Sequence, residues 1–214
     1  AILNRANAEG VGSVATYPFG RGGFEVSKLE EATAKRYLPA AELSKLKSTS
    51  ASNPQCEYAR KLFLFSYYCY GISFIDMAML TTAHIKQMED GDYIVYKRQK
   101  IKRQKGVKPI SIKITPAIRQ LIESLQAASP TVDDFLLPVV TRSGYTGERL
   151  YMHIRTRYSK YQKYLRLLAE ELGIDFHLTS YVSRHTAAMT LQRNHIPREV
   201  ISQMLGHADL ETTN

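Results

Sequence analysis

The sequence predicts a mainly helical α+β fold, in which a helical bundle carries one small antiparallel sheet. From residue 39 onward most segments repeat apolar residues at helical spacing, and only residues 93–96 and 109–114 have the composition of strands. Hydrophobic residues make up 44% and charged residues 23% of the 214 positions, as in an ordinary soluble globular protein. No internal repeat or low-complexity segment points to another class.

The first 38 residues differ from the rest of the chain. Residues 1–11 are typical of the end of a helix that begins upstream, whereas residues 17–26 hold a proline and three glycines and indicate a strand with a turn. Residues 30–39 have the character of a linker. We therefore expect a remnant of a preceding module with its linker at residues 1–38, and the main domain at residues 39–214.

The segments before the sheet are expected to be helical. Asn53 and Pro54 supply an N-cap and a first-turn proline. Ser73 and Asp76 have the spacing of a capping box. The resulting helices cover residues 40–46, 55–70 and 73–80.

The two predicted strands flank a strongly basic segment. Residues 97–108 hold seven Lys or Arg residues and no acid, so the pattern predicts a β-hairpin with a cationic tip. Pro109 cannot donate a hydrogen bond to a neighbouring strand. Its strand is therefore expected to begin there or to lie at an edge of the sheet.

After the sheet the chain returns to helical patterns. Thr115 and Pro116 begin one helix, Gly173 ends a long one, and Thr179 or Ser180 caps the next. The predicted helices cover residues 116–127, 151–172, 180–193 and 197–206.

The charge of the chain indicates a polyanionic partner. Lys and Arg outnumber Asp and Glu by 29 to 20, a formal net charge of +9. The excess is concentrated in residues 97–108 and in residues 149–166, a second acid-free run with interleaved tyrosines. One such run is usually a solvated face, but two in a basic chain favour contact with phosphates, on nucleic acid or on an anionic membrane face.

Several classes of chemistry lack their motifs. No GxxxxGK[ST] segment indicates a P-loop, and the six histidines show no HxxxH or HExxH spacing. Cys56 and Cys69 do not complement the histidines, so we expect no metal and no cofactor. Two cysteines fit a reducing compartment, and no apolar run is long enough to cross a membrane, so a cytoplasmic protein is expected.

The strongest signal lies in residues 178–214. Tyr181 and Arg184 are three positions apart and share a helix face near its N-terminus, where free N–H groups favour a phosphate. A planar guanidinium can contact two phosphate oxygens. Taken alone, Arg184 and His185 are a common surface pair, and His207 is an ordinary turn residue after a glycine that stops a helix.

In their full context these residues resemble the tyrosine recombinase (phage integrase) family, and especially the branch carried by conjugative transposons. The most specific segments are R-H-T-A-A and L-G-H-A-D-L-E-T-T near the C-terminus, and the resemblance covers residues 58–214. Residues 65–85 resemble the first arginine box of the family, and residues 94–112 resemble its catalytic-lysine hairpin. Residues 17–26 resemble the link between its core-binding and catalytic domains.

The resemblance implies a fold, a reaction and partners. It implies a tyrosine-recombinase catalytic-domain fold, preceded at residues 1–38 by a remnant of the core-binding domain. It implies site-specific DNA recombination or integration, by strand cleavage and rejoining through a 3′-phosphotyrosyl intermediate, which needs neither ATP nor a metal. The implied partners are double-stranded DNA and further copies of the protein in a synaptic tetramer, with no membrane.

Family roles are carried over where residues match. Arg184 matches the second catalytic arginine, His207 the histidine of the LGH motif, and Lys100 the hairpin lysine, with Lys102 as the second choice. Fixed cations offset charge on the phosphate, and the lysine protonates the departing 5′-oxygen. The expected catalytic residues are Arg184, His207, Lys100, Tyr181 and Ser73, and the expected DNA-binding residues are Arg98, Lys102, Arg103, Lys105, Arg155 and Arg157.

The chain departs from the family pattern at three places. Ser73 stands where the first arginine is usual, and Tyr181 stands where a histidine is usual. The nucleophilic tyrosine is expected beyond Asn214, so this chain alone is not expected to cleave DNA. Arg98 is the candidate for a compensating arginine, and a simple N-cap role for Ser73 stays equally open.

Two other interpretations remain. Residues 195–213 also have the pattern of a helix-turn-helix, which would make the chain a non-catalytic DNA-binding module. A type IB topoisomerase relative would share the chemistry without bringing two DNA sites together. A tyrosine shortly after Asn214 would favour an enzyme over a DNA reader.

Overall fold

The computed structural model describes three stretches of the chain, which belong to two compact units. The described residues are 2–11, 37–102 and 104–205, and the units are Ala1–Lys35 and Arg36–Asn214. The assignment of residues 1–38 to a core-binding remnant and of residues 39–214 to a catalytic domain stays a prediction.

The first unit contains one short described helix, α1 (Ile2–Ala8). Gly10 follows it with a φ of +72°, the left-handed conformation that commonly ends helices. This agrees with the helix end predicted there. The strand and turn predicted at residues 17–26 lie outside the described residues.

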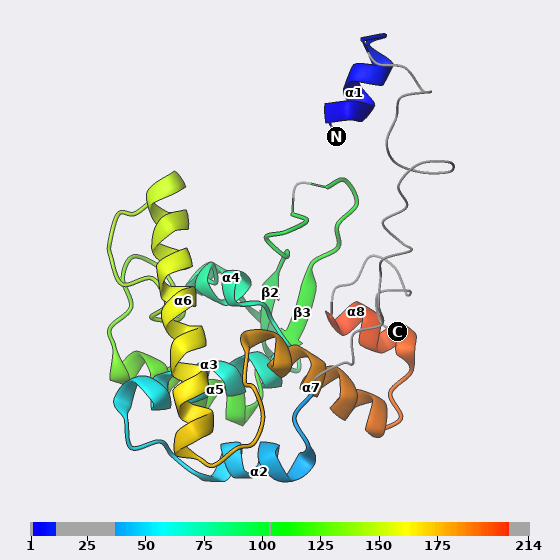
Figure 1. Ribbon diagram of the computed structural model, residues 1–214. Coiled ribbons are helices and arrows are strands. Elements are labelled where there is room, and N and C mark those ends of the chain that lie inside the picture. Colours follow the sequence, from blue (N-terminus) through cyan, green and yellow to red (C-terminus); the bar gives the residue numbers. More distant parts are fainter. Residues whose placement is uncertain (1, 12–36, 103, 206–214) are drawn as a thin grey trace. The chain divides into compact units, whose positions relative to one another are not determined.

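The second unit is mainly helical with one small antiparallel sheet, which confirms the predicted fold class (Figure 1). Helix α3 is its centre, because α3 packs against α5, α6 and α7. The helices are α2 (Ala40–Ser48), α3 (Pro54–Tyr68), α4 (Phe74–Ala78), the 3-10 helix η3 (Thr82–His84), α5 (Pro116–Ala128), α6 (Gly147–Glu171), α7 (Ser180–Arg193) and α8 (Arg198–Leu205).

The central position of α3 follows from its sequence. The side chain of Asn53 accepts hydrogen bonds from the backbone N–H groups of Gln55 and Cys56, and Pro54 occupies the first turn, as predicted. Leu62, Phe63 and Phe65 are fully buried. Burial of each such side chain stabilises the fold by about 1.5–3 kcal/mol, so α3 anchors the hydrophobic core.

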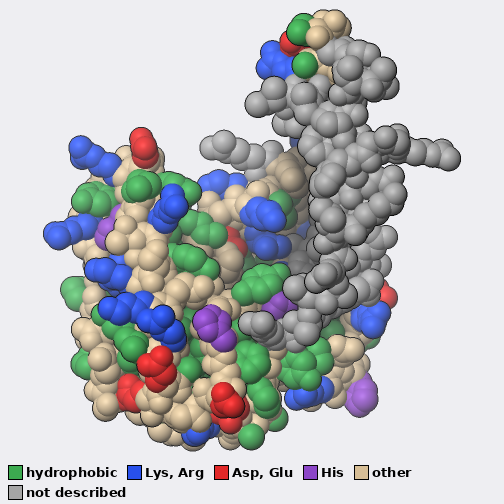
Figure 2. All heavy atoms as spheres, viewed as in Figure 1, with side chains coloured by type: hydrophobic (Ala, Val, Ile, Leu, Met, Phe, Trp, Pro, Cys, Tyr) green, Lys and Arg blue, Asp and Glu red, His purple; other side chains and the backbone are tan. Residues whose placement is uncertain are grey.

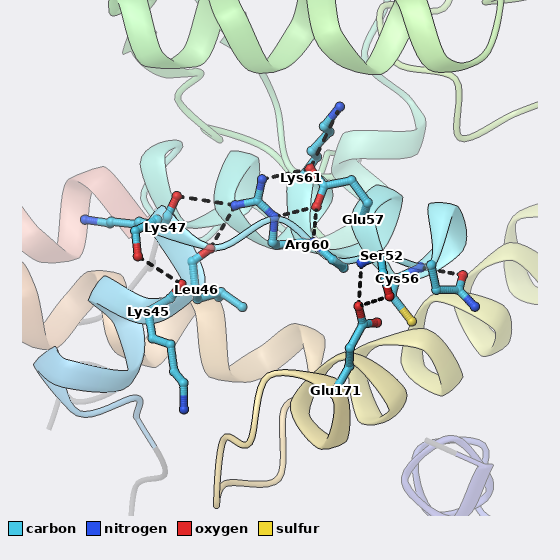
Figure 3. A network of polar contacts seen from close by, with 12 residues as sticks. Lys45, Leu46, Lys47, Ser52, Cys56, Glu57, Arg60, Lys61 and Glu171 are labelled. Atoms are coloured by element: carbon cyan, nitrogen blue, oxygen red, sulfur yellow. Dashed lines mark hydrogen bonds and ion pairs between the residues drawn. The ribbon is translucent and has the colours of Figure 1, made fainter.

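Polar contacts join α2 to α3, and the end of α6 to the segment just before α3 (Figure 3). The guanidinium of Arg60 pairs with Glu57 at 2.7 Å and donates to the carbonyl oxygen of Leu46 at 2.8 Å. Near the end of α6, the carboxylate of Glu171 accepts from the Ser52 hydroxyl at 2.7 Å. Arg60 is only 8% exposed, and its hydrogen bonds offset the cost of burying its charge.

The sheet has three antiparallel strands in the order β1-β2-β3: β1 (Ile85–Met88), β2 (Gly91–Tyr96) and β3 (Ile110–Lys113). Ile94 of β2 pairs with Ile85 on one side and Ile112 on the other. Pro109 lies directly before β3, which is an edge strand, as predicted. The basic segment at residues 97–108 joins β2 to β3.

The predicted hairpin is formed by β2 and β3, which pair antiparallel. Strand β1, which adds a third strand to this hairpin, was not predicted. Its residues after Ile85 are exposed. An exposed strand does not need the alternation of apolar and polar residues that identifies a half-buried strand, which is why the sequence pattern missed it.

Several helix ends differ from the predictions by two to four residues, among them the end of α2 at Ser48 and the end of α3 at Tyr68. Helix α6 begins at Gly147, four positions before the predicted start at residue 151, because its first turn is exposed and lacks an apolar stripe. Helix α4 ends at Ala78 instead of Leu80. The predicted stop at Gly173, with a φ of +58°, is confirmed.

Candidate functional site

A cleft of about 500 Å³ lies between α4, α6, α7 and the start of the loop that joins β2 to β3. Five residues expected from the sequence to act in the site or on DNA line this cleft: Ser73, Arg98, Arg155, Tyr181 and Arg184. The remaining lining is largely apolar or aromatic, with Phe74, Ile75, Tyr151, Ile154 and Tyr158 among its residues. The cleft therefore combines cationic groups with an apolar wall, as ligand sites commonly do.

Arg184 is held by two backbone carbonyl groups. Its Nη1 donates to the carbonyl oxygen of Gly71 at 3.0 Å, and its Nη2 donates to that of Leu205. Gly71 has a φ of +74°, and a Cβ placed on it would lie 2.4 Å from the Cα of Arg184. A glycine is therefore required at position 71 for α7 to approach so closely.

Burial and a neighbouring cation both disfavour the charge of Arg184. Burial, followed by the nearby charge of Arg98, lowers the pKa of Arg184 to about 10. Asp76 and Tyr96 act on this pKa in the opposite direction. Arg184 still keeps its charge at neutral pH, so two neighbouring cations face the cleft, where an anion would reduce their repulsion.

Ser73 is the N-cap of α4, as one of the two interpretations of this residue predicted. Its hydroxyl accepts from the backbone N–H of Asp76 and donates to the Asp76 carboxylate at 2.6 Å. The hydroxyl has one proton, and that proton is directed at Asp76. In this arrangement Ser73 has no second proton to donate to a ligand in the cleft.

Asp76 is a residue of the site whose role was not predicted beyond helix capping. It is only 3% exposed, and its carboxylate also accepts from the backbone N–H of Gln99 at 2.7 Å. This hydrogen bond ties the start of the β2–β3 loop to α4, directly beside Arg98. The capping-box spacing of Ser73 and Asp76 identified Asp76 in the sequence. It gave no indication that the Asp76 carboxylate would also bind the backbone of Gln99.

Tyr181 lies at the open side of the cleft. Its side chain is 62% exposed, and its ring meets the ring of His185 edge to face, with the centroids 4.5 Å apart. Behind it, α7 is joined to α3 by the hydroxyl groups of Ser183 and Ser66, whose oxygens are 2.8 Å apart and buried. The position of α7 is therefore fixed from its buried side.

The remaining predicted residues lie elsewhere or outside the description. Lys100, Lys102 and Lys105 are exposed on the β2–β3 loop and do not line the cleft. Arg157 is half-buried, donates to the carbonyl oxygen of Val139 at 3.1 Å and lies over the Tyr58 ring. Arg103 and His207 lie outside the described residues. The functional roles assigned to all these residues stay predictions.

Basic side chains gather on the face that contains the cleft. Figure 2 shows Lys and Arg side chains over α6 and again beside α4 and β2, with hydrophobic side chains between them. Among the described residues, no three His, Cys, Asp or Glu side chains come together as metal ligands would. None of the described helices is both long enough and apolar enough to span a membrane.

The model of the phage integrase family matches residues 36–214, which is most of the chain. No match was found among curated proteins.

Solved structures with a similar fold include recombinases and a transposon integrase. The XerA recombinase has a TM-score of 0.59 at 21% identity, over 86% of this chain and 60% of that chain. The XerH site-specific recombinase bound to difH substrate has a TM-score of 0.58 at 18% identity, over 84% of this chain and 49% of that one. The Tn1549 transposon integrase in complex with transposon right end DNA has a TM-score of 0.63 at 12% identity, over 89% of this chain and 64% of that one.

These solved proteins share the fold of this chain, and the chain spans between about half and two thirds of their lengths. The fold agrees with the tyrosine-recombinase catalytic-domain fold expected from the sequence. With its family model matched over residues 36–214, the chain belongs to the phage integrase family, the tyrosine recombinases.

Proposed function

We propose that this chain is the catalytic part of a site-specific DNA recombinase or integrase, which cleaves and rejoins DNA through a 3′-phosphotyrosyl intermediate. The observation that carries the proposal is that a chain of this family places Arg184 and Arg98 at one cleft, with Arg184 fixed by two carbonyl groups. The DNA complexes of the XerH recombinase and of the Tn1549 integrase support DNA as the substrate.

In this proposal the cleft holds the scissile phosphate. Arg184 contacts its non-bridging oxygens, where negative charge accumulates as the phosphorus becomes five-coordinate. Donors that are already in position stabilise such a transition state without reorganisation. The hydrogen bonds of Arg184 to Gly71 and Leu205 supply this fixed position.

Arg98 replaces the arginine that the family usually has at the position of Ser73. The Ser73 hydroxyl gives its proton to Asp76, whereas Arg98 brings a full charge to the cleft from the β2–β3 loop. The hydrogen bond from Gln99 to Asp76 holds the adjacent backbone. The second cation thus comes from a different element and serves the same phosphate.

The reaction itself exchanges one ester bond for another. The hydroxyl oxygen of a tyrosine that follows Asn214 attacks the phosphorus and releases its proton to solvent, and the bond from phosphorus to the 5′-oxygen breaks. The departing 5′-oxygen takes a proton from Lys100, with Lys102 as the alternative donor. His207 and Tyr181 donate hydrogen bonds to phosphate oxygens, and rejoining reverses these steps.

The basic side chains of α6 and of the β2–β3 loop form the surface for double-stranded DNA. Arg155 lines the cleft itself and would contact a phosphate beside the scissile one. Two DNA sites come together when further copies of the protein assemble on DNA as a synaptic tetramer. Residues 1–38 would then be the remnant of the core-binding domain and its linker.

A suicide substrate tests this proposal in the protein that includes the residues after Asn214. A nicked duplex that loses its 5′-fragment upon cleavage should trap a covalent protein–DNA adduct that survives denaturation. Arg184→Ala should slow adduct formation by about 10²–10³-fold, because it removes one fixed donor to the transition state. Arg119→Ala, which removes a surface ion pair with Asp92 on the sheet side, should leave the rate unchanged.

The other interpretations predict different results. A protein that binds the duplex but gives no adduct would be a helix-turn-helix reader and not an enzyme. An adduct formed without pairing of two DNA sites would point to topoisomerase-like chemistry instead of recombination.

A further inference from the structure

The first turn of α7 is capped from another helix. Thr179 occupies the N-cap position, but its side chain makes no capping hydrogen bond. Instead, the backbone N–H of Ser180 donates to Oε1 of Gln162 on α6, at 2.9 Å. The first N–H groups of a helix have no partner within it, so Gln162 supplies what the local sequence does not.

Gln162 also organises a small polar cluster. Its Nε2 donates to the hydroxyl oxygen of Tyr158 at 3.1 Å. The same hydroxyl oxygen lies 3.1 Å from Oγ of Ser180. One amide thus joins the backbone at the start of α7 to a tyrosine that lines the cleft.

The position of this cluster gives it a consequence for the site. Ser180 directly precedes Tyr181, and Arg184 follows one helical turn later. The buried pair of Ser66 and Ser183 holds the other side of the same turn. Movement of the first turn of α7 would therefore shift Tyr181 and Arg184, two of the three residues that this helix contributes to the cleft.

We propose that Gln162 is a positioning residue for the phosphate site, which holds the first turn of α7 against α6 and so orients Tyr181 and Arg184. The inference rests on the proposed function, because it assigns a role within that site. In the proposed function, helix α6 also carries basic side chains that contact DNA. Gln162 therefore joins the helix that contacts the DNA backbone to the helix that contacts the reacting phosphate.

The chemistry of the amide suggests two informative variants. Gln162→Leu keeps the approximate size of the side chain and removes both hydrogen bonds. Gln162→Glu keeps an acceptor for the Ser180 N–H, and it can accept a hydrogen bond from the Tyr158 hydroxyl in place of donating one. Its negative charge is also favourable at a helix N-terminus.

Three measurements on the protein that includes the residues after Asn214 test the inference. They are duplex affinity, the single-turnover cleavage rates of a phosphodiester and of a 5′-bridging phosphorothiolate, and amide hydrogen exchange. Gln162→Leu should leave the dissociation constant within about twofold and slow both cleavage rates by about fivefold, the effect of one hydrogen bond of about 1 kcal/mol. Amide hydrogen exchange at residues 181–184 should be faster in Gln162→Leu than in the unsubstituted protein. Gln162→Glu should cleave at close to the unsubstituted rate.

Gln126→Leu is the matched control. Gln126 lies on α5 and donates to the carbonyl oxygen of Leu136 at 3.0 Å, away from the cleft. It should affect neither cleavage nor exchange at α7.

Three results would overturn the inference. The first is wild-type cleavage by Gln162→Leu, and the second is unchanged exchange at residues 181–184. The third is a parallel loss of affinity, rate and exchange protection across the whole domain, which would indicate a general structural role. If the unsubstituted protein forms no adduct, the proposed function fails, and this outcome is distinguishable from failure of the positioning role. Unchanged exchange at residues 181–184 in Gln162→Leu would still refute the positioning role.

Discussion

Arg184 and Lys100 belong to two regions of the second unit that differ in how firmly they are held. Arg184 lies in a cleft, where two backbone carbonyl groups accept hydrogen bonds from its guanidinium and Gly71 packs against its backbone. Lys100 is exposed on the β2–β3 loop, and no hydrogen bond or ion pair joins its side chain to another described residue.

This difference matches the two tasks that the proposed reaction assigns to them. Negative charge on a phosphate is stabilised best by cations that need no reorganisation, and side chains held by packed helices meet this requirement. Delivering a proton to a departing oxygen requires a group that can approach once DNA is bound, and a loop suits that task. The comparison therefore separates a fixed binding site from a loop that DNA would position.

The largest difference between the two regions should appear when a methyl group is added to a glycine in each. Gly71→Ala should lower the free energy of unfolding by about 3 kcal/mol or more, because the new Cβ meets the backbone of Arg184 in a left-handed conformation. Gly106 on the loop has a similar φ of +78°, but a Cβ added there would have no atom within 4 Å. Gly106→Ala should cost only about 1 kcal/mol.

Urea denaturation of both variants measures the two costs. Equal decreases in stability would mean that strain in the backbone alone decides both positions. The tight packing of α7 against Gly71 would then contribute nothing.

A smaller effect is expected where the cleft and the loop meet. Asp76→Asn should lower stability by about 2 kcal/mol, since the buried carboxylate accepts from both the Ser73 hydroxyl and the Gln99 N–H. The substitution also removes a negative charge that acts on Arg184. Asp92→Asn, which breaks an exposed ion pair with Arg119, is the control and should cost less than about 1 kcal/mol.

Denaturation midpoints of the two variants at neutral pH check this difference. If Asp76→Asn is as mild as Asp92→Asn, the link between α4 and the loop is not a structural constraint. A contact other than the hydrogen bond from Gln99 to Asp76 would then have to hold Arg98 at the cleft.

The smallest effect should concern the loop alone. Replacing Lys102 and Lys105 with Gln should make the slope of log K against log salt shallower by up to about 1.8, at about 0.9 for each phosphate that the variant no longer neutralises. Fluorescence anisotropy with a labelled duplex gives the slope for this chain. The control replaces Lys45 and Lys47 on α2, at the opposite end of the second unit from the loop (Figure 1), and should leave the slope unchanged.

An unchanged slope in the loop variant would show that the loop tip faces solvent in the complex. The DNA-contacting cations would then have to be sought on α6.

Much of the fold was predictable because its elements carry local signals. Helix α3 has its cap and first-turn proline, and β2 and β3 have a buried isoleucine each at their pairing positions. Strand β1 gave no signal, since its residues are exposed and show no alternation. The early start of α6 was missed for the same reason.

Residues of the candidate site were predictable where they belong to a sequence motif. Contacts between segments that are distant in the sequence were not. Tyr181, Arg184 and Ser73 were selected from their sequence contexts, and all three line the cleft. The contacts of Asp76 with Gln99 and of Gln162 with Ser180 join residues 23 and 18 positions apart. No periodicity or capping rule relates such pairs, because they depend on how whole elements pack.

The distinction between a fixed arginine and a loop lysine is tested most directly by two substrates in the protein that includes the residues after Asn214. A 5′-bridging phosphorothiolate leaves as a thiolate whose conjugate acid has a pKa of about 8.5, so it needs no protonation. Lys100→Ala should slow cleavage of the ordinary phosphodiester and spare the phosphorothiolate, whereas Arg184→Ala should slow both. A selective defect in Lys102→Ala with none in Lys100→Ala would move the acid role to Lys102. Cleavage of both substrates at wild-type rates by Arg184→Ala would contradict the account, because the fixed cleft would then not hold the reacting phosphate.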